Sequence, residues 1–176
     1  RGGVWEKRIP EAVHVLYVDE LCNPKNYLKQ LIIQGHPVLA LWKALLFYRS
    51  IKVNNYWKEN HLLTEFLPKL QQKYDVAIAY ISGEVLYFVD EKVNAKRKLV
   101  WIHNDYRKAM HPRKYDYKHL VNMDGIVSIS DECVDILKDE FPEFASKMYM
   151  LENITSSIAL KKQASEFYPS EYKKDD

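Results

Sequence analysis

The chain has 176 residues, of which 47% are hydrophobic and 28% charged, so it fits one globular domain with a proper core. Its net charge of +2 is too small to favour nucleic acid as a partner. Two cysteines, Cys22 and Cys133, exclude a disulfide framework and favour a reducing cytoplasm. The sequence contains no run of roughly 18 apolar residues that would span a bilayer.

The first part of the chain predicts one strand followed by three helices. Residues 12–18 alternate and are β-branched, which favours a strand. Helices are predicted over 25–34, 37–52 and 62–73. Gly35 and Pro37 separate the first two helices, because glycine permits a left-handed cap and proline cannot continue a helix. Within the third helix, Pro68 is tolerated only with a kink or a restart.

From residue 74 onward the pattern alternates between strands and helices. Strands are predicted over 76–81, 99–103, 125–129 and 148–151, and helices over 84–93, 115–122, 133–141 and 156–166. The continuous apolar run over 76–81 is typical of a strand buried on both faces. Such alternation predicts an α/β fold with a Rossmann-like parallel sheet, right-handed crossovers and helices on both faces.

Residues that can bind a ligand or take part in catalysis follow each of these four predicted strands. They are Ser82 and Gly83 after the first, His103 and Asp105 after the second, Ser130 after the third and Asn153 after the fourth. Because the carboxyl ends of parallel strands meet at one edge of a sheet, these residues predict a ligand site there. Each has a structural alternative. The alternatives are a plain strand–helix turn at Ser82 and Gly83, a histidine that hydrogen-bonds only to backbone, an aspartate that caps a loop turn and a serine that caps the next helix.

Four motifs in order resemble the amino-terminal half of group 1, family 4-like, retaining glycosyltransferases of the GT-B fold. They are Tyr-Asp-Val-Ala-Ile-Ala-Tyr at 74–80, Trp-Ile-His-Asn-Asp at 101–105, Asp-Gly-Ile-Val-Ser-Ile-Ser at 124–130 and Asn-Ile at 153–154. The resemblance implies that 1–166 form an acceptor-side Rossmann-like domain without its first strand-helix unit. It also implies that 167–176 are a linker toward an absent carboxyl-terminal donor domain.

The resemblance further implies a nucleotide sugar as donor, a saccharide or lipid-linked saccharide as acceptor, and no cofactor or metal. It places His103 in the cleft near the transferred sugar, where an imidazole can stabilise developing charge. The same edge is expected to bind the acceptor through Tyr80, Ser82, Gly83, Asp105, Tyr106, Arg107 and Lys108, and to reach the hinge through Ser130 and Asn153. Asp105 can either orient the His103 ring or cap a turn.

Two basic features suggest where such an enzyme acts. Arg107 and Lys108 suit a lipid pyrophosphate or an anionic membrane surface, and a plain solvated loop is the alternative. The helix over 37–52 carries Trp42 and Leu45 beside Arg49, which suits membrane contact, although core packing is its default interpretation. We therefore expect a cytoplasmic protein at the inner face of a membrane.

A second hypothesis from another class is a non-catalytic Rossmann-like module that binds a saccharide or a protein. A further α/β domain encoded after Asp176 favours the enzyme, and a stop codon there favours the module. A flavodoxin-like nucleotide site is disfavoured, because the sequence shows no glycine-rich phosphate loop.

Overall fold

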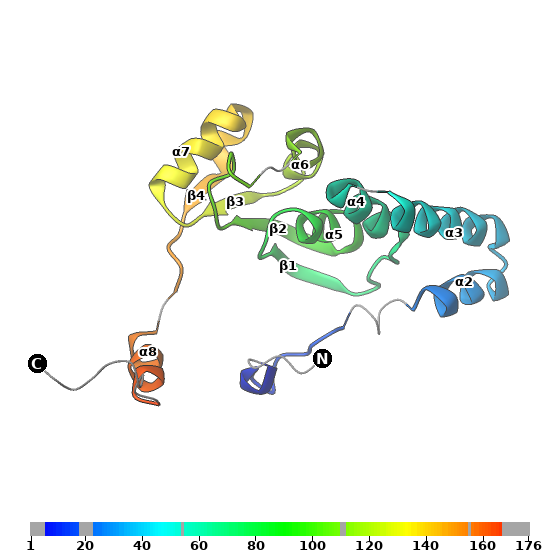
Figure 1. The fold of residues 1–176 in the computed structure, drawn as a ribbon, viewed down its shortest axis with the longest axis horizontal. Helices are drawn as coiled ribbons and strands as arrows, with labels where there is room; N and C mark the ends of the chain where they lie inside the picture. Colours follow the sequence, from blue (N-terminus) through cyan, green and yellow to red (C-terminus); the bar gives the residue numbers. More distant parts are fainter. Residues whose placement is uncertain (1–5, 18–22, 54, 110–111, 155, 167–176) are drawn as a thin grey trace, which may run out of the picture.

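The computed structural model describes residues 6–17, 23–53, 55–109, 112–154 and 156–166. Their centre is a sheet of four parallel strands in the order β1-β2-β3-β4 (Figure 1). The strands are β1 (Lys73–Ala79), β2 (Asn94–Ile102), β3 (Gly125–Ser128) and β4 (Met148–Met150). The four strands predicted from residue 74 onward are confirmed, with β2 starting five residues earlier than expected, at Asn94 rather than residue 99.

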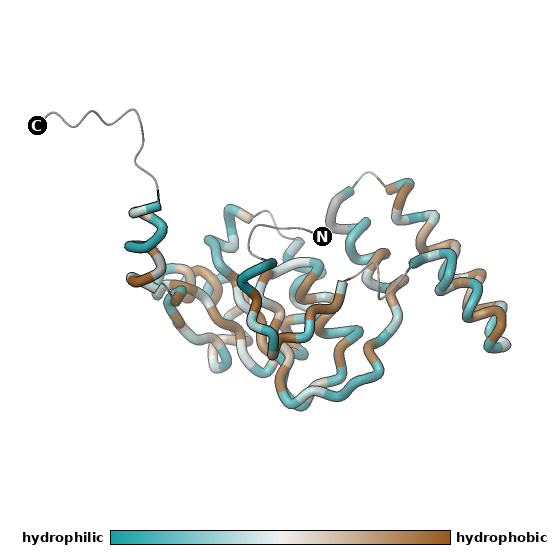
Figure 2. Tube along the Cα trace, turned by 90° about the horizontal axis from the view of Figure 1, so that it is seen from below, coloured by the Kyte–Doolittle hydropathy of each residue, from teal (hydrophilic) through white to brown (hydrophobic). Residues whose placement is uncertain are grey.

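Helices occupy the connections and the amino-terminal part of the described chain. They are α2 (Pro24–Ile33), α3 (Pro37–Lys52), α4 (Tyr56–Phe66), α5 (Glu84–Lys92), α6 (Arg113–Leu120), α7 (Asp131–Glu140) and α8 (Ser157–Ala164), with 3-10 turns η1 (Glu6–Arg8) and η2 (Pro142–Lys147). In Figure 1 the helix α8 and the η1 segment lie apart from the sheet, and in Figure 2, seen from below, α8 stands at one end of the described chain while the η1 segment overlaps the rest of it.

Two sequence predictions about the amino-terminal part are wrong. Residues 12–17 form no strand, and Val13 and Leu16 lie exposed, because alternation alone does not make a strand without a partner to pair with. Val18, the last residue of that prediction, lies outside the described residues. The third helix begins at Tyr56 rather than residue 62, because the Asn55 side chain caps it by accepting from the Lys58 amide at 2.9 Å.

The expectation of helices on both sheet faces is also wrong for the described residues. Each strand lies beside the previous one in the same direction, so right-handed crossovers bring α5, α6 and α7 to one face (Figure 1). On that face Ala79, Val100 and Ile126 are fully buried. On the other face Val76 and Ile78 keep 50% and 47% of their surface, so β1 is not buried on both sides.

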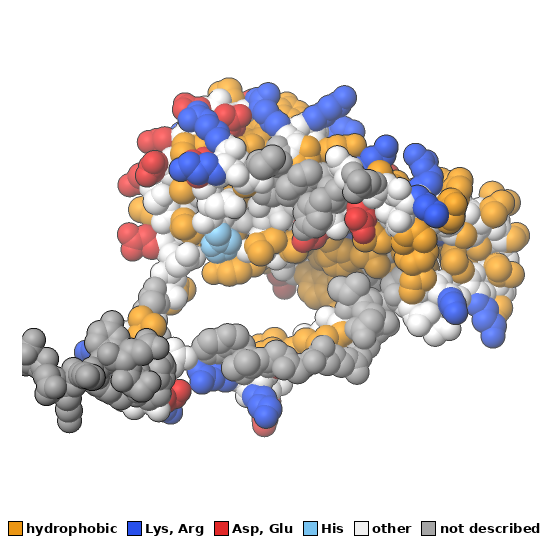
Figure 3. All heavy atoms as spheres, in the orientation of Figure 1, with side chains coloured by type: hydrophobic (Ala, Val, Ile, Leu, Met, Phe, Trp, Pro, Cys, Tyr) orange, Lys and Arg blue, Asp and Glu red, His pale blue; other side chains and the backbone are white. Residues whose placement is uncertain are grey.

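The helix α3 buries a different stripe from the one its sequence suggests. Ala40, Lys43, Leu46 and Ser50 are its buried residues, and the helix packs against α4. The large apolar residues Val38, Leu41, Trp42, Leu45 and Tyr48 are 49–81% exposed. Figure 3 shows hydrophobic side chains gathered over this end of the molecule, with Lys and Arg beside them. Core packing, the default interpretation of this helix, is therefore confirmed for Leu46 and wrong for Trp42, Leu45 and Tyr48.

The remaining domain predictions are not settled by the fold. The described residues up to 166 contain the expected Rossmann-like sheet, but nothing in them identifies a GT-B half. The predicted linker over 167–176 lies outside the described residues. Among the described helices, none has the length and apolar character needed to cross a membrane.

Candidate functional site at the carboxyl edge of the sheet

The strand register brings the predicted site residues to one edge. Val100 pairs with Ile126, and Ile102 pairs with Ser128, which pairs in turn with Met150. Because all the strands are parallel, His103, Ser130 and the segment after β4 leave the sheet on the same side. The structure thus places the predicted residues at one edge of the sheet, and the contacts of each side chain decide what it can do.

His103 follows β2 and contacts the end of β1. Its Nε2 atom donates to the Tyr80 carbonyl at 3.0 Å, since a carbonyl can only accept. The neutral ring then carries its lone pair on Nδ1, which can accept a hydrogen from a hydroxyl group. The backbone contact that the sequence analysis gave as a structural alternative is therefore present, and it also fixes the tautomer.

Aromatic rings form a wall beside this imidazole. The Tyr80 ring lies 4.8 Å from the His103 ring in an edge-to-face arrangement and 5.7 Å from the Trp101 ring. Tyr80 is 59% exposed, so more than half of its surface meets solvent. Such rings offer an apolar face and a polar end, which suits a ligand that has both apolar and hydrated polar surfaces.

The turn between β1 and α5 depends on glycine. Gly83 has φ of 79°, a left-handed conformation that side-chain-bearing residues rarely adopt, and it stands at the N-cap of α5 without a side-chain cap. Ser82 is half-buried just before it. The free amides of a helix start can hold hydroxyl or phosphate oxygens, but Glu84 places a negative charge in the first turn of α5.

Asp105 stabilises its own turn. Its Oδ1 atom accepts from the Arg107 amide at 3.0 Å, and its Oδ2 atom lies 3.2 Å from Nζ of Lys108. Although desolvation acts to raise the pKa of Asp105, the Lys108 ammonium and the Arg107 amide hold it below its ordinary value. Among the described contacts no hydrogen bond joins Asp105 to His103, so the turn-capping interpretation fits.

The prediction that Tyr106 binds an acceptor is wrong. Tyr106 is 4% exposed, its hydroxyl donates to Asp116 Oδ2 at 2.9 Å, and its ring packs edge-on against Phe141 at 5.0 Å. A tyrosine ring contributes more to the stability of the fold when it is buried than when it lines a solvent-exposed binding site. Tyr106 is therefore a core residue that anchors the loop after β2.

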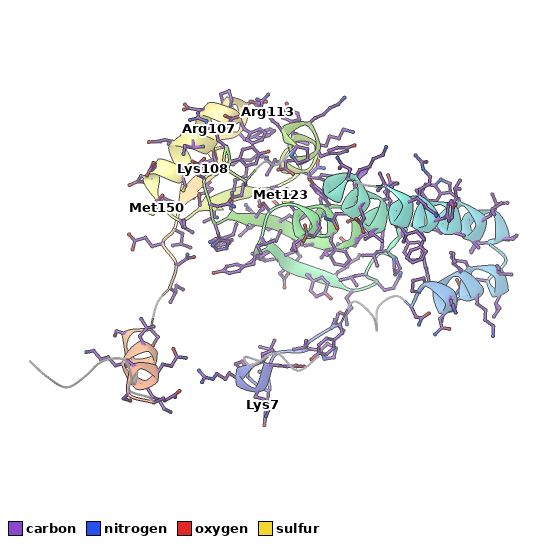
Figure 4. All side chains as sticks on the ribbon, in the orientation of Figure 1. Lys7, Arg107, Lys108, Arg113, Met123 and Met150 are labelled. Atoms are coloured by element: carbon purple, nitrogen blue, oxygen red, sulfur yellow. The ribbon has the colours of Figure 1, made fainter. Side chains whose placement is uncertain are left out.

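The basic residues of this loop are already paired. Arg107 donates through Nε to Glu140 and through Nη2 to Asp139, each at 2.9 Å, and these hydrogen bonds raise its pKa. Figure 4 shows Arg107 and Arg113 both beside α7. Lys108, whose side chain is 86% exposed, pairs with Asp105. The structure thus places Lys108 at the surface beside Asp105 and directs Arg107 toward α7.

Ser130 is a helix cap, as its alternative interpretation predicted. Its Oγ atom accepts from the Cys133 amide at 3.2 Å at the start of α7. Asn153 lies exposed beyond β4, in the segment that leads to α8. No ligand contact is needed to explain Ser130, while Asn153 stays a prediction for the hinge.

Sequence reasoning missed a buried polar cluster behind this edge. Asp116 on α6 is 1% exposed and accepts from the hydroxyls of Tyr87 at 2.7 Å and Tyr106 at 2.9 Å. Burial and the Asp116 charge both raise the pKa of each tyrosine. No sequence signal marks the cluster, because Tyr87 lies 29 positions from Asp116.

The sheet, its order and its covering helices define an α/β protein with a Rossmann-like parallel sheet. Comparison of the chain with protein-family models, with curated proteins and with solved structures finds no match in any of the three. The glycosyltransferase resemblance therefore depends on the four sequence motifs and on what the carboxyl edge can do chemically.

Proposed function

We propose that this chain is the acceptor-binding domain of a nucleotide-sugar-dependent glycosyltransferase that acts in polysaccharide or lipid-linked saccharide synthesis. One observation carries the proposal: the imidazole of His103 stands at the carboxyl end of β2 with its tautomer fixed by the Tyr80 carbonyl at 3.0 Å. This leaves Nδ1 as an acceptor at the edge where α/β sheets bind ligands. The four motifs, in matching order, support the same assignment.

The proposed role of His103 is to receive a hydrogen bond from a sugar hydroxyl and to stabilise charge as transfer proceeds. Tyr80 and Trp101 supply ring faces against which the apolar side of a sugar packs. Lys108, which is exposed in the loop after β2 and lies beside Asp105, pairs with a phosphate if the acceptor carries one. Arg107 takes no part, because its guanidinium is held by Asp139 and Glu140.

The test uses the longest natural protein that contains this chain. It is incubated with a panel of nucleotide sugars and saccharide acceptors, and release of the nucleotide is measured. We expect His103→Ala to reduce turnover by about 10²-fold or more, the usual contribution of a positioned acid-base or charge-stabilising group. His36→Ala is the matched control, because His36 is exposed at the start of α3. Unchanged turnover in His103→Ala would remove His103 from the mechanism.

Membrane contact is the second part of the proposal. The outward face of α3 presents Leu41, Trp42 and Leu45 to solvent, and Arg49 and Lys52 stand in its last turn. An apolar face with adjoining cations binds an anionic lipid surface. Co-sedimentation with phosphatidylglycerol vesicles is expected for the chain and reduced for Trp42→Asp. Equal sedimentation of both proteins, or none with either, rejects this face.

A non-catalytic saccharide-binding module is the other candidate, and the aromatic wall beside His103 favours it as much as it favours an enzyme. Quenching of tryptophan fluorescence by saccharides measures binding directly, because Trp101 belongs to that wall. Binding that is lost in Tyr80→Ala, together with no transfer from any nucleotide sugar by the longest natural protein, selects the module over the enzyme.

A further inference from the structure

Three residues from three of the helices lie close together at a distance from the carboxyl edge of the sheet. They are His61 on α4, Glu91 on α5 and His119 on α6, and each offers one ligand atom within 4.8 Å of the other two. The helices α5 and α6 run back from the carboxyl edge, so their last turns, which contain Glu91 and His119, lie toward the opposite edge. The cluster is therefore separate from His103.

The tautomer of His119 is fixed by a carboxylate. Its Nδ1 atom lies 2.8 Å from Asp90 Oδ2, so Nδ1 donates, and in the neutral ring the lone pair is then on Nε2. Asp90 is held in turn by Nδ2 of Asn122 at 3.0 Å. These hydrogen bonds lower the pKa of Asp90, although desolvation acts to raise it. A carboxylate behind a histidine is the usual outer support of a metal-binding imidazole.

Two nitrogens in the cluster lack partners. His119 Nε2 and His61 Nδ1 are buried, and neither has a hydrogen-bond partner among the described residues. The His119 side chain is 6% exposed, and its Nε2 points toward Glu91 Oε1 at 3.9 Å. An unpaired buried polar atom is unfavourable, and a cation that accepts a lone pair from each nitrogen satisfies both of them.

We propose that His61, Glu91 and His119 bind a zinc ion. Two imidazoles and one carboxylate are ligands that Zn²⁺ prefers. With bonds of about 2.0–2.1 Å, tetrahedral ligand atoms lie about 3.3 Å apart, so the present separations close by small side-chain rotations. Three protein ligands leave the fourth position for water.

The carboxylates and helix ends around the cluster also suit a dication. Glu91 and Asp90 supply two carboxylates, of which Asp90 also has Lys98 Nζ 4.0 Å away, and the last turns of α5 and α6 present carbonyl ends that favour cations. Lys92 lies 3.8 Å from Glu91 Oε2, which leaves Oε1 to face His119. Asp90 and Glu91 also line a surface hollow. The ion adds a shared link to three helices that hydrogen bonds already join in pairs, α5 to α6 through Tyr87 and Asp116 and α5 to α4 through Lys92 and the Glu65 carbonyl.

The first test is direct binding. The chain is stripped with a chelator, freed of it and titrated with Zn²⁺ against a chromophoric indicator. We expect one equivalent to bind, and we expect His61→Ala and His119→Ala each to weaken binding at least tenfold. His36→Ala is the control and should bind as the wild type does. Binding that is absent, or that is unchanged in both cluster variants, overturns the proposal.

A second measurement covers the case in which the histidine variants fail to fold. Glu91→Gln keeps the shape of the side chain and removes its charge, and Asp90→Asn removes only the outer support. We expect Asp90→Asn to weaken binding by about 10–100-fold. Saturating zinc is expected to raise the melting temperature by about 5–10 °C in the wild type and by less in Glu91→Gln. Equal shifts in the two proteins contradict the site.

Discussion

Replacing Asp116 with alanine is expected to lower the free energy of unfolding by about 3 kcal/mol. The Asp116 carboxylate accepts from Tyr87 and Tyr106, and all three side chains are buried. Each tyrosine hydroxyl that loses its acceptor costs about 1–3 kcal/mol, so two give about 2–6 kcal/mol. Relief from burying a carboxylate offsets part of this loss, which places the net value in the lower half of that range.

Urea unfolding followed by circular dichroism measures this loss. At a similar denaturant dependence, the midpoint moves to lower urea for Asp116→Ala, and Tyr87→Phe and Tyr106→Phe each lose about 1.5–3 kcal/mol. The double variant with Tyr87→Phe and Tyr106→Phe tests whether the two hydrogen bonds to Asp116 are coupled. If they are, the stability loss of the double variant differs from the sum of the two single losses. Asp135→Ala is the control, since Asp135 lies exposed on α7. A loss below about 1 kcal/mol in Asp116→Ala refutes the reasoning.

Three further predictions follow from single contacts. Burial and the nearby carboxylate raise the pKa of Tyr106, so the folded chain keeps a proton that the unfolded chain releases. Stability is then full below about pH 10 and falls above it, and this fall is smaller in Tyr106→Phe when urea midpoints are compared between pH 8 and 11. Ser130→Ala is expected to cost about 0.5–2 kcal/mol of unfolding free energy through the lost cap on α7, and an unchanged urea midpoint rejects that role. Gly125→Ala places a Cβ atom 2.8 Å from Leu99 Cδ2, and the Leu99 side chain can rotate toward the open sheet face. We therefore expect the free energy of unfolding to fall by about 1 kcal/mol or less. A larger loss in thermal unfolding shows that Leu99 cannot rotate away.

The parallel sheet was predictable because its strands are local patterns. The runs that became β1 to β4 are apolar and are separated by helical stretches, and such alternation leads to a parallel sheet with few exceptions. The cap at Ser130 was predictable for the same reason, since a cap depends on the next three residues alone. The edge that contains His103 follows directly from the strand ends.

Predictions failed where a partner from elsewhere in the chain decides the outcome. The residues 12–17 alternate like a strand, yet a strand needs a neighbour that pairs with it, and local pattern does not supply one. The helix α3 has apolar residues on more than one side, so only its contact with α4 decides that Leu46 is buried and Leu45 is exposed. Tyr106 was predicted to bind a ligand because it comes directly after the His103–Asp105 motif, but its hydroxyl is buried in a hydrogen bond to Asp116.

The sequence by itself determined the strands, the crossover helices and the polar residues that end each strand, because each of these depends on a few neighbouring residues. Only the tertiary structure decided which sheet face the helices cover, that Arg107 pairs with α7, and that Tyr106 is buried. It also brought together His61, Glu91 and His119, which lie on three different helices. The physical reason is that burial and pairing depend on distant segments, whose positions no local pattern contains.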